Sequence, residues 1–75
     1  MTLCDLKPGQ KGKVLSFGTE GVLRHRLLDM GITTGIEIQL VKVAPLGDPL
    51  EIRLRGYNLS LRKSEASAIE IKFIE

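Results

Sequence analysis

The chain has 75 residues, of which 43% are hydrophobic and 27% are charged, and its formal net charge is +2. This length predicts one small domain, residues 1–75, with a single core, because a chain of this size buries only about 60% of its unfolded surface. The composition excludes a disordered chain, no apolar run approaches the ~20 residues of a membrane span, and the interspersed charges indicate a mixed solvated surface rather than a polyanion-binding block.

The N-terminal segment bears on the cellular compartment. Residues 1–5 contain neither a basic segment nor an apolar stretch, so no secretory leader is visible. The single cysteine, Cys4, excludes an internal disulfide and fits a reducing compartment. We therefore expect the protein in the cytoplasm.

Apolar residues alternate with polar ones in five short stretches, which is typical of half-buried strands. These stretches cover residues 13–17, 36–43, 50–55, 59–62 and 69–73. The alternation places Phe73, in the last stretch, in the core. In the second stretch the apolar phase changes after Leu40 to Val41 and Val43, and such a change of face predicts a bulge or a sharp bend.

One helix is predicted between Thr19 and Met30, and residues 21–30 are expected to cover one end of the fold. Thr19 can cap its start, and Gly31 suits the left-handed conformation after a last helical turn. The side chains divide between two faces: Leu23, Leu27 and Met30 form the inward stripe with Leu28 at its shoulder, while Arg24, His25 and Asp29 point outward. Residues 63–66 are expected to add a single helical turn.

The turn residues suggest how the third and fourth strands pair. If Gly56 and Tyr57 form a two-residue loop of type II′, Leu54 faces Leu59 and Ile52 faces Leu61. The order of elements then predicts a mainly β protein, a small SH3-like bent antiparallel barrel of five to six strands with one short α-helix.

Catalysis and tight metal binding are both poorly supported. The chain has one His, one Cys and no clustered carboxylate pair, so we expect no enzymatic activity. The weak candidates for metal ligands are Cys4, His25, Asp29 and Asp48. His25 and Asp29 lie one helical turn apart and could hold a divalent transition metal weakly, but two ligands provide little, and a solvated pair is the favoured interpretation. We expect no required cofactor.

An RNA-binding barrel module is the alternative from another class of function. Arginines are available on the strands and on the helix: Arg53, Arg55 and Arg62, and Arg24 and Arg26. Stacking on bases needs aromatic side chains, and the chain has only Phe17, Tyr57 and Phe73. We therefore expect no specific nucleic-acid partner.

The end of the predicted helix has two interpretations. In the first, the helix is a lid on the barrel, and Gly31 is required by backbone geometry alone. In the second, the same segment is a partner-binding surface, in which Leu28 and Met30 form an apolar edge flanked by Arg24 and Arg26.

A family resemblance rests on segments in a specific order and spacing: Leu6–Val14, Arg26–Ile32, Gly35, Ala44–Pro49, Arg55–Tyr57, Leu61–Lys63 and Glu65–Ala66. Through these segments the chain, over nearly its whole length, resembles the FeoA family of small SH3-like proteins. FeoA-like domains also occur as tails of iron-dependent repressors, but no winged-helix segment precedes this one, so a free-standing FeoA is the better match.

The resemblance implies an accessory protein of ferrous iron uptake, peripheral to the inner face of the membrane. Its implied partner is an FeoB-type transporter, a membrane protein with a cytoplasmic GTP-binding domain, which the chain would assemble or regulate by docking.

Overall fold

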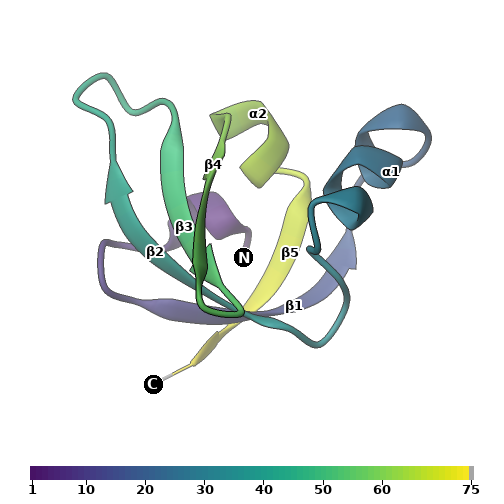
Figure 1. The fold of residues 1–75 in the computed structure, drawn as a ribbon, viewed down its shortest axis with the longest axis horizontal. Helices are drawn as coiled ribbons and strands as arrows, with labels where there is room; N and C mark the ends of the chain where they lie inside the picture. Colours follow the sequence, from purple (N-terminus) through teal and green to yellow (C-terminus); the bar gives the residue numbers. More distant parts are fainter. Residues whose placement is uncertain (75) are drawn as a thin grey trace.

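Five antiparallel strands curl around one hydrophobic core in the computed structural model, which describes residues 1–74 (Figure 1). The strands are β1 (Lys11–Phe17), β2 (Glu37–Val43), β3 (Leu50–Leu54), β4 (Tyr57–Leu61) and β5 (Ile69–Ile74), in the sheet order β4-β3-β2-β1-β5. This arrangement confirms the predicted fold class, a mainly β, SH3-like bent sheet of five strands.

Three short helical segments accompany the sheet. They are a 3₁₀ turn, η1 (Leu3–Asp5), the helix α1 (Val22–Asp29) and the single turn α2 (Lys63–Ala66). The turn at residues 63–66 confirms the prediction, whereas no sequence pattern had indicated η1. The helices α1 and α2 lie toward the same end of the barrel, the upper end in Figure 1.

The core is built from the inward positions of the strands and from single residues of the helical segments. Val14, Ile38, Ile52 and Ile69 are almost fully buried, as the alternation predicts. The remaining buried apolar residues are Leu3, Leu6, Leu27, Ile32, Leu40, Leu50, Leu54, Leu61, Ala66 and Ile71. In the described part of the chain, no helix combines the length and apolar character that crossing a membrane requires.

The predicted bulge in the second strand is present. The pairing of β2 with β3 shifts between Leu40 and Lys42, so Val41 is the extra residue. The shift does not carry a second set of apolar side chains into the core, because Val41 is half-buried and Val43, at the end of the strand, is exposed.

The register predicted for the β3–β4 hairpin is wrong by two residues. Leu54 pairs with Tyr57 and Ile52 with Leu59, and the two-residue loop consists of Arg55 and Gly56. Both loop residues have positive φ, +49° and +83°, which is the type I′ rather than the type II′ geometry. Because side chains alternate with a period of two, a shift of two residues leaves the same face inward, and the apolar pattern cannot distinguish the two registers.

Two further expectations are wrong. Thr19 does not cap the helix, since α1 begins at Val22 after Gly21, whose φ is +74°, and no side chain caps it. Phe73 is 39% exposed rather than in the core. It pairs with Gly12, and the space that Gly12 leaves inside the barrel is filled by Ile71, whose Cδ1 lies 2.5 Å from where a Cβ at Gly12 would be.

Candidate protein-docking site

The helix α1 contributes apolar residues both to the core and to the surface. Leu27 is fully buried, and Leu23 and Met30 are partly buried against the core. The next residue after Leu27, Leu28, is 36% exposed. The inward stripe of the helix, Leu23, Leu27 and Met30, is therefore packed against the core, whereas Leu28 lies at the surface.

Both arginines of α1 have contacts within the chain. The Nη1 atom of Arg26 lies 3.4 Å from Oε2 of Glu65, a carboxylate that is only 6% exposed. The other oxygen of Glu65 accepts a 2.9 Å hydrogen bond from the backbone N–H of Arg62. The guanidinium of Arg24 lies 6.0 Å from the centre of the Phe17 ring. Arg26 thus links α1 to α2, while 62% of its side chain is exposed to solvent.

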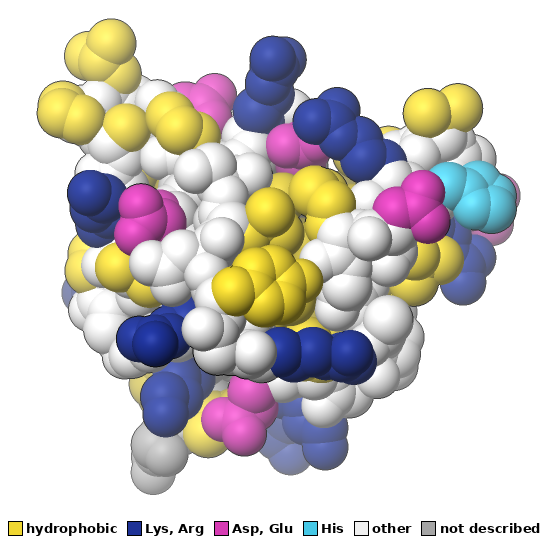
Figure 2. All heavy atoms as spheres, viewed as in Figure 1, with side chains coloured by type: hydrophobic (Ala, Val, Ile, Leu, Met, Phe, Trp, Pro, Cys, Tyr) yellow, Lys and Arg dark blue, Asp and Glu magenta, His cyan; other side chains and the backbone are white. Residues whose placement is uncertain are grey.

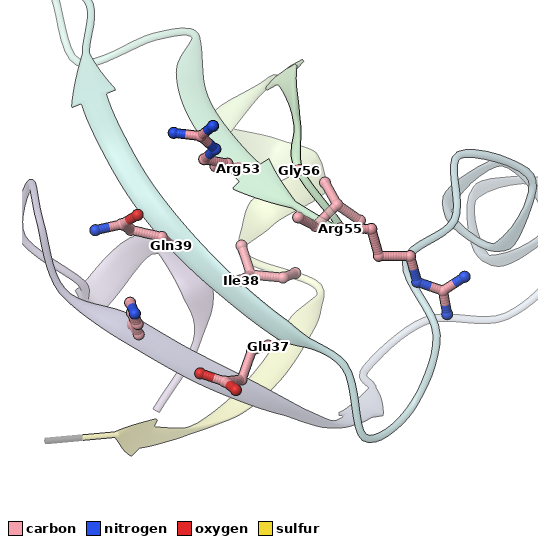
Figure 3. Close-up of a pocket in the computed structure, with 8 residues that line it drawn as sticks. Glu37, Ile38, Gln39, Arg53, Arg55 and Gly56 are labelled. Carbon is pink, nitrogen blue, oxygen red and sulfur yellow. The ribbon is translucent and has the colours of Figure 1, made fainter.

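The exit of α1 is fastened to the β3–β4 hairpin. The hydroxyl of Tyr57 donates a 2.7 Å hydrogen bond to the carbonyl of Met30, the C-cap of α1. The Nη2 atom of Arg55 donates a 3.3 Å bond to Oγ1 of Thr33, and Figure 3 shows the Arg55 side chain reaching from the turn toward the loop after α1. The sequence analysis missed both contacts, since they join segments far apart in the chain.

Gly31 has the left-handed conformation that the sequence predicts, with φ of +89°. A second constraint adds to the backbone one. A Cβ at this position would lie 2.8 Å from the hydroxyl oxygen of Tyr57, which is closer than van der Waals contact allows. The position is therefore restricted by its backbone conformation and by the hairpin that closes over it.

The four candidate metal ligands do not converge on one site. Cys4 and Asp48 both contact the first residue of α2: the Cys4 thiol donates to the carbonyl of Lys63 at 3.4 Å, and Oδ1 of Asp48 accepts from its N–H at 2.9 Å. His25 and Asp29 lie on α1, and both are exposed. Among residues 1–74, no group of three or more His, Cys, Asp or Glu side chains could hold a metal ion. Burial raises the pKa of the Cys4 thiol, which disfavours the thiolate that metals bind.

The arginines considered for RNA binding lie in different surroundings. Arg53 and Arg55 line a shallow depression of about 190 Å³ on the outer surface of the sheet, together with Lys11, Glu37 and Gln39 (Figure 3). Arg62, by contrast, lines a separate depression beside Asp48 and Pro49. Tyr57, the aromatic residue expected to be available on a turn, is engaged with Met30.

Comparisons with known proteins give one consistent family. The model of the FeoA domain matches residues 1–72. The Fe(2+) transport protein A/Fe(2+) transporter FeoB fusion protein of Porphyromonas gingivalis is 39% identical over 74 residues, which is 99% of this chain. The chain spans only 9% of the length of that protein.

Solved structures agree with this assignment. An FeoA-like protein from Clostridium acetobutylicum is 43% identical, with a TM-score of 0.93 over 100% of this chain and 87% of that one. The Stenotrophomonas maltophilia FeoA complexed with zinc, described as a prokaryotic SH3 domain protein, is 28% identical, with a TM-score of 0.83 over 96% of this chain and 89% of that one.

Proposed function

The chain belongs to the FeoA family, and on that premise we propose that it is a non-enzymatic accessory protein of ferrous iron uptake that docks on an FeoB-type transporter. The observation that supports this most is the relative from P. gingivalis, in which a segment matching this chain is fused to FeoB. Covalent linkage holds two partners at high effective concentration, so it suits a pair that acts together. The proposed location is the cytoplasmic side of the membrane, where the transporter's GTP-binding domain lies.

The proposed docking surface is the α1 edge, by which we mean Arg24, Arg26, Leu28, Met30 and Gly31. Its centre is apolar, because Leu28 is 36% exposed and Met30, two residues later, is half-buried. Its rim carries two arginines, and Arg is enriched at protein interfaces. Glu65 and Phe17 already position these arginines, so less side-chain entropy is lost on docking.

A capture experiment in detergent tests this surface. Immobilised FeoB-type transporter, and its GTP-binding and membrane domains separately, would be incubated with wild-type protein and with the variant Leu28→Glu. A charge at this partly exposed position should weaken capture without unfolding the protein, which thermal melting would verify. The control is Arg53→Glu on the outer sheet surface, which should be captured like the wild type. Normal capture of Leu28→Glu together with loss of Arg53→Glu would move the interface to the sheet.

Metal binding is a second candidate role, supported by the zinc complex of the S. maltophilia relative. We propose that any such binding here is weak and not required for docking, because the described ligand groups stay apart in the fold. Titration calorimetry with Zn²⁺ and Fe²⁺ should show no stoichiometric site of submicromolar affinity. A tight site that disappears in Cys4→Ser or His25→Ala would contradict this and identify its ligand.

A further inference from the structure

The fold gathers charges that are interspersed along the sequence. On the outer surface of the sheet, Lys13 of β1 pairs with Glu37 of β2 and with Lys72 of β5. Directly opposite residues in neighbouring strands share a face of the sheet, so these side chains are neighbours. We call the whole group the basic sheet face: Lys11, Lys13, Arg53 and Lys72, with Glu37 among them. In Figure 2 dark blue side chains gather around one acidic group along the lower edge of the molecule.

Gln39 joins the two halves of the basic sheet face. It pairs with Lys11 on one side and with Arg53 on the other. Lys11 and Arg53 thus lie two strands apart, a distance of roughly 10 Å at the usual strand spacing. Arg53 and Lys11 also line the shallow depression of about 190 Å³, so the two cations lie around one spot near the centre of the face.

Other carboxylates near this surface are already engaged. Glu51 accepts a hydrogen bond from Asn58 at 3.2 Å and lies 4.0 Å from the ammonium of Lys42. Glu70 lies 3.5 Å from the N-terminal amine. The whole chain carries 11 cationic and 9 acidic residues, and the outer surface of the sheet, with Lys42 included, holds five strand cations to the three carboxylates of Glu37, Glu51 and Glu70. The small net charge of the protein is therefore concentrated on one side of the barrel.

We propose that the basic sheet face rests on an anionic phospholipid surface and holds the protein beside the membrane in which its transporter lies. The location next to a membrane rests on the proposed function, while the choice of partner rests on charge and shape. Juxtamembrane Lys and Arg side chains are attracted by anionic lipids over about a Debye length. The outer surface of a curled sheet is convex, so it can approach a broad lipid surface.

Lipid suits this face better than RNA does. Single-stranded RNA is bound by basic grooves that carry aromatic platforms for the bases. The residues lining the depression include no aromatic side chain, and Tyr57 at the adjacent turn is engaged with Met30. Long Lys and Arg side chains over a shallow surface can follow mobile headgroups without a fixed geometry.

Flotation with vesicles tests the proposal directly. The protein would be mixed with phosphatidylcholine vesicles and with vesicles containing about one-third phosphatidylglycerol, at low salt and at about 1 M salt, where the Debye length is about 3 Å. We expect binding only to the anionic vesicles and loss of binding at high salt. The double variant Lys11→Gln, Arg53→Gln should bind roughly 20- to 30-fold more weakly, since each lost charge is worth about fivefold near such a surface. The matched control, Arg62→Gln with Lys63→Gln, removes one Arg and one Lys near α2 and should bind like the wild type.

Three results would overturn the proposal. They are equal binding to neutral and anionic vesicles, equal losses in the two double variants, and displacement from the vesicles by an oligoribonucleotide that the protein holds at near-physiological salt. The last would assign the face to nucleic acid. This outcome is separate from transporter docking. Leu28→Glu should float with anionic vesicles like the wild type but should not be captured by the transporter in detergent. Arg53→Glu should be captured like the wild type but should not float with the vesicles.

Discussion

The hydroxyl of Tyr57 donates a 2.7 Å hydrogen bond to the carbonyl of Met30, so the first residue of β4 fastens the residue that ends α1. This bond satisfies one of the carbonyls that a helix leaves without an intrahelical partner at its C-terminus. It also fixes the exit of α1, and with it the position of Leu28 and Met30 on the proposed docking surface.

Removing this hydrogen bond should destabilise the fold modestly. For Tyr57→Phe we expect the free energy of unfolding to fall by about 0.5–1.5 kcal/mol, the usual net value of one hydrogen bond. The low end of that range is expected, because Tyr57 is 43% exposed and water can replace part of the bond. Urea denaturation monitored by circular dichroism measures the change. An unchanged midpoint would mean that Tyr57 does not stabilise the helix exit.

Gly31 and Gly35 provide a matched pair for separating strain from steric clash. Both have positive φ, +89° and +92°, but a Cβ at Gly35 meets open space while one at Gly31 meets the Tyr57 hydroxyl. Gly35→Ala should cost about 1–2 kcal/mol of unfolding free energy from the left-handed backbone alone. Gly31→Ala should cost more than that in the same denaturation assay.

The excess cost at Gly31 should depend on the hydroxyl that causes it. In a Tyr57→Phe background the clashing oxygen is absent, so Gly31→Ala should then cost about as much as Gly35→Ala does. A double-mutant cycle measures this coupling, which we expect to be nonzero because the two residues are in contact. Strict additivity would show that the backbone conformation is the sole constraint at Gly31.

Adjacent leucines of α1 should respond very differently to truncation. Leu27 is fully buried, so Leu27→Ala should lower the free energy of unfolding by about 2–5 kcal/mol, through lost burial and the cavity that remains. Leu28→Ala should change it far less, since Leu28 is 36% exposed. Thermal melting of the two variants checks the prediction. If Leu27→Ala melts like the wild type, the helix is packed on another face.

Cys4 should react slowly with alkylating reagents in the folded protein. Burial raises the pKa of its thiol, so at a given pH the reactive thiolate fraction is smaller than in the unfolded chain. The rate of iodoacetamide labelling can be followed by mass spectrometry between about pH 7 and pH 10. The pH at which this rate increases should be higher for the native protein than for the guanidinium-unfolded protein.

The same pKa shift predicts how stability depends on pH. The folded state holds the thiol proton more tightly than the unfolded state, so this contribution is complete below the pKa of the unfolded thiol and is lost as the pH rises through the pKa of the folded one. Cys4→Ser should remove that part of the alkaline loss of stability. An identical alkaline profile for this variant would contradict the assignment to Cys4.

Short-range patterns in the sequence determined which residues form strands and which of their faces is buried. Ile52, Leu54 and Ile69 lie in the core where the alternation places them, because a half-buried strand has to bury every second residue. The end of α1 just before Gly31 and the bulge after Leu40 were also predictable from the local sequence, because a glycine suited to positive φ and a change of apolar phase are both visible within a few residues.

The tertiary structure alone decided how these elements meet. The alternation is unchanged by a shift of two residues, so only packing could select Arg55 and Gly56 as the hairpin loop. The bond from Tyr57 to Met30 and the pair of Arg26 with the buried Glu65 join residues 27 or more positions apart, which no local pattern encodes. The basic sheet face arises in the same way, because charges spread evenly along the chain come together only when the strands that carry them pair.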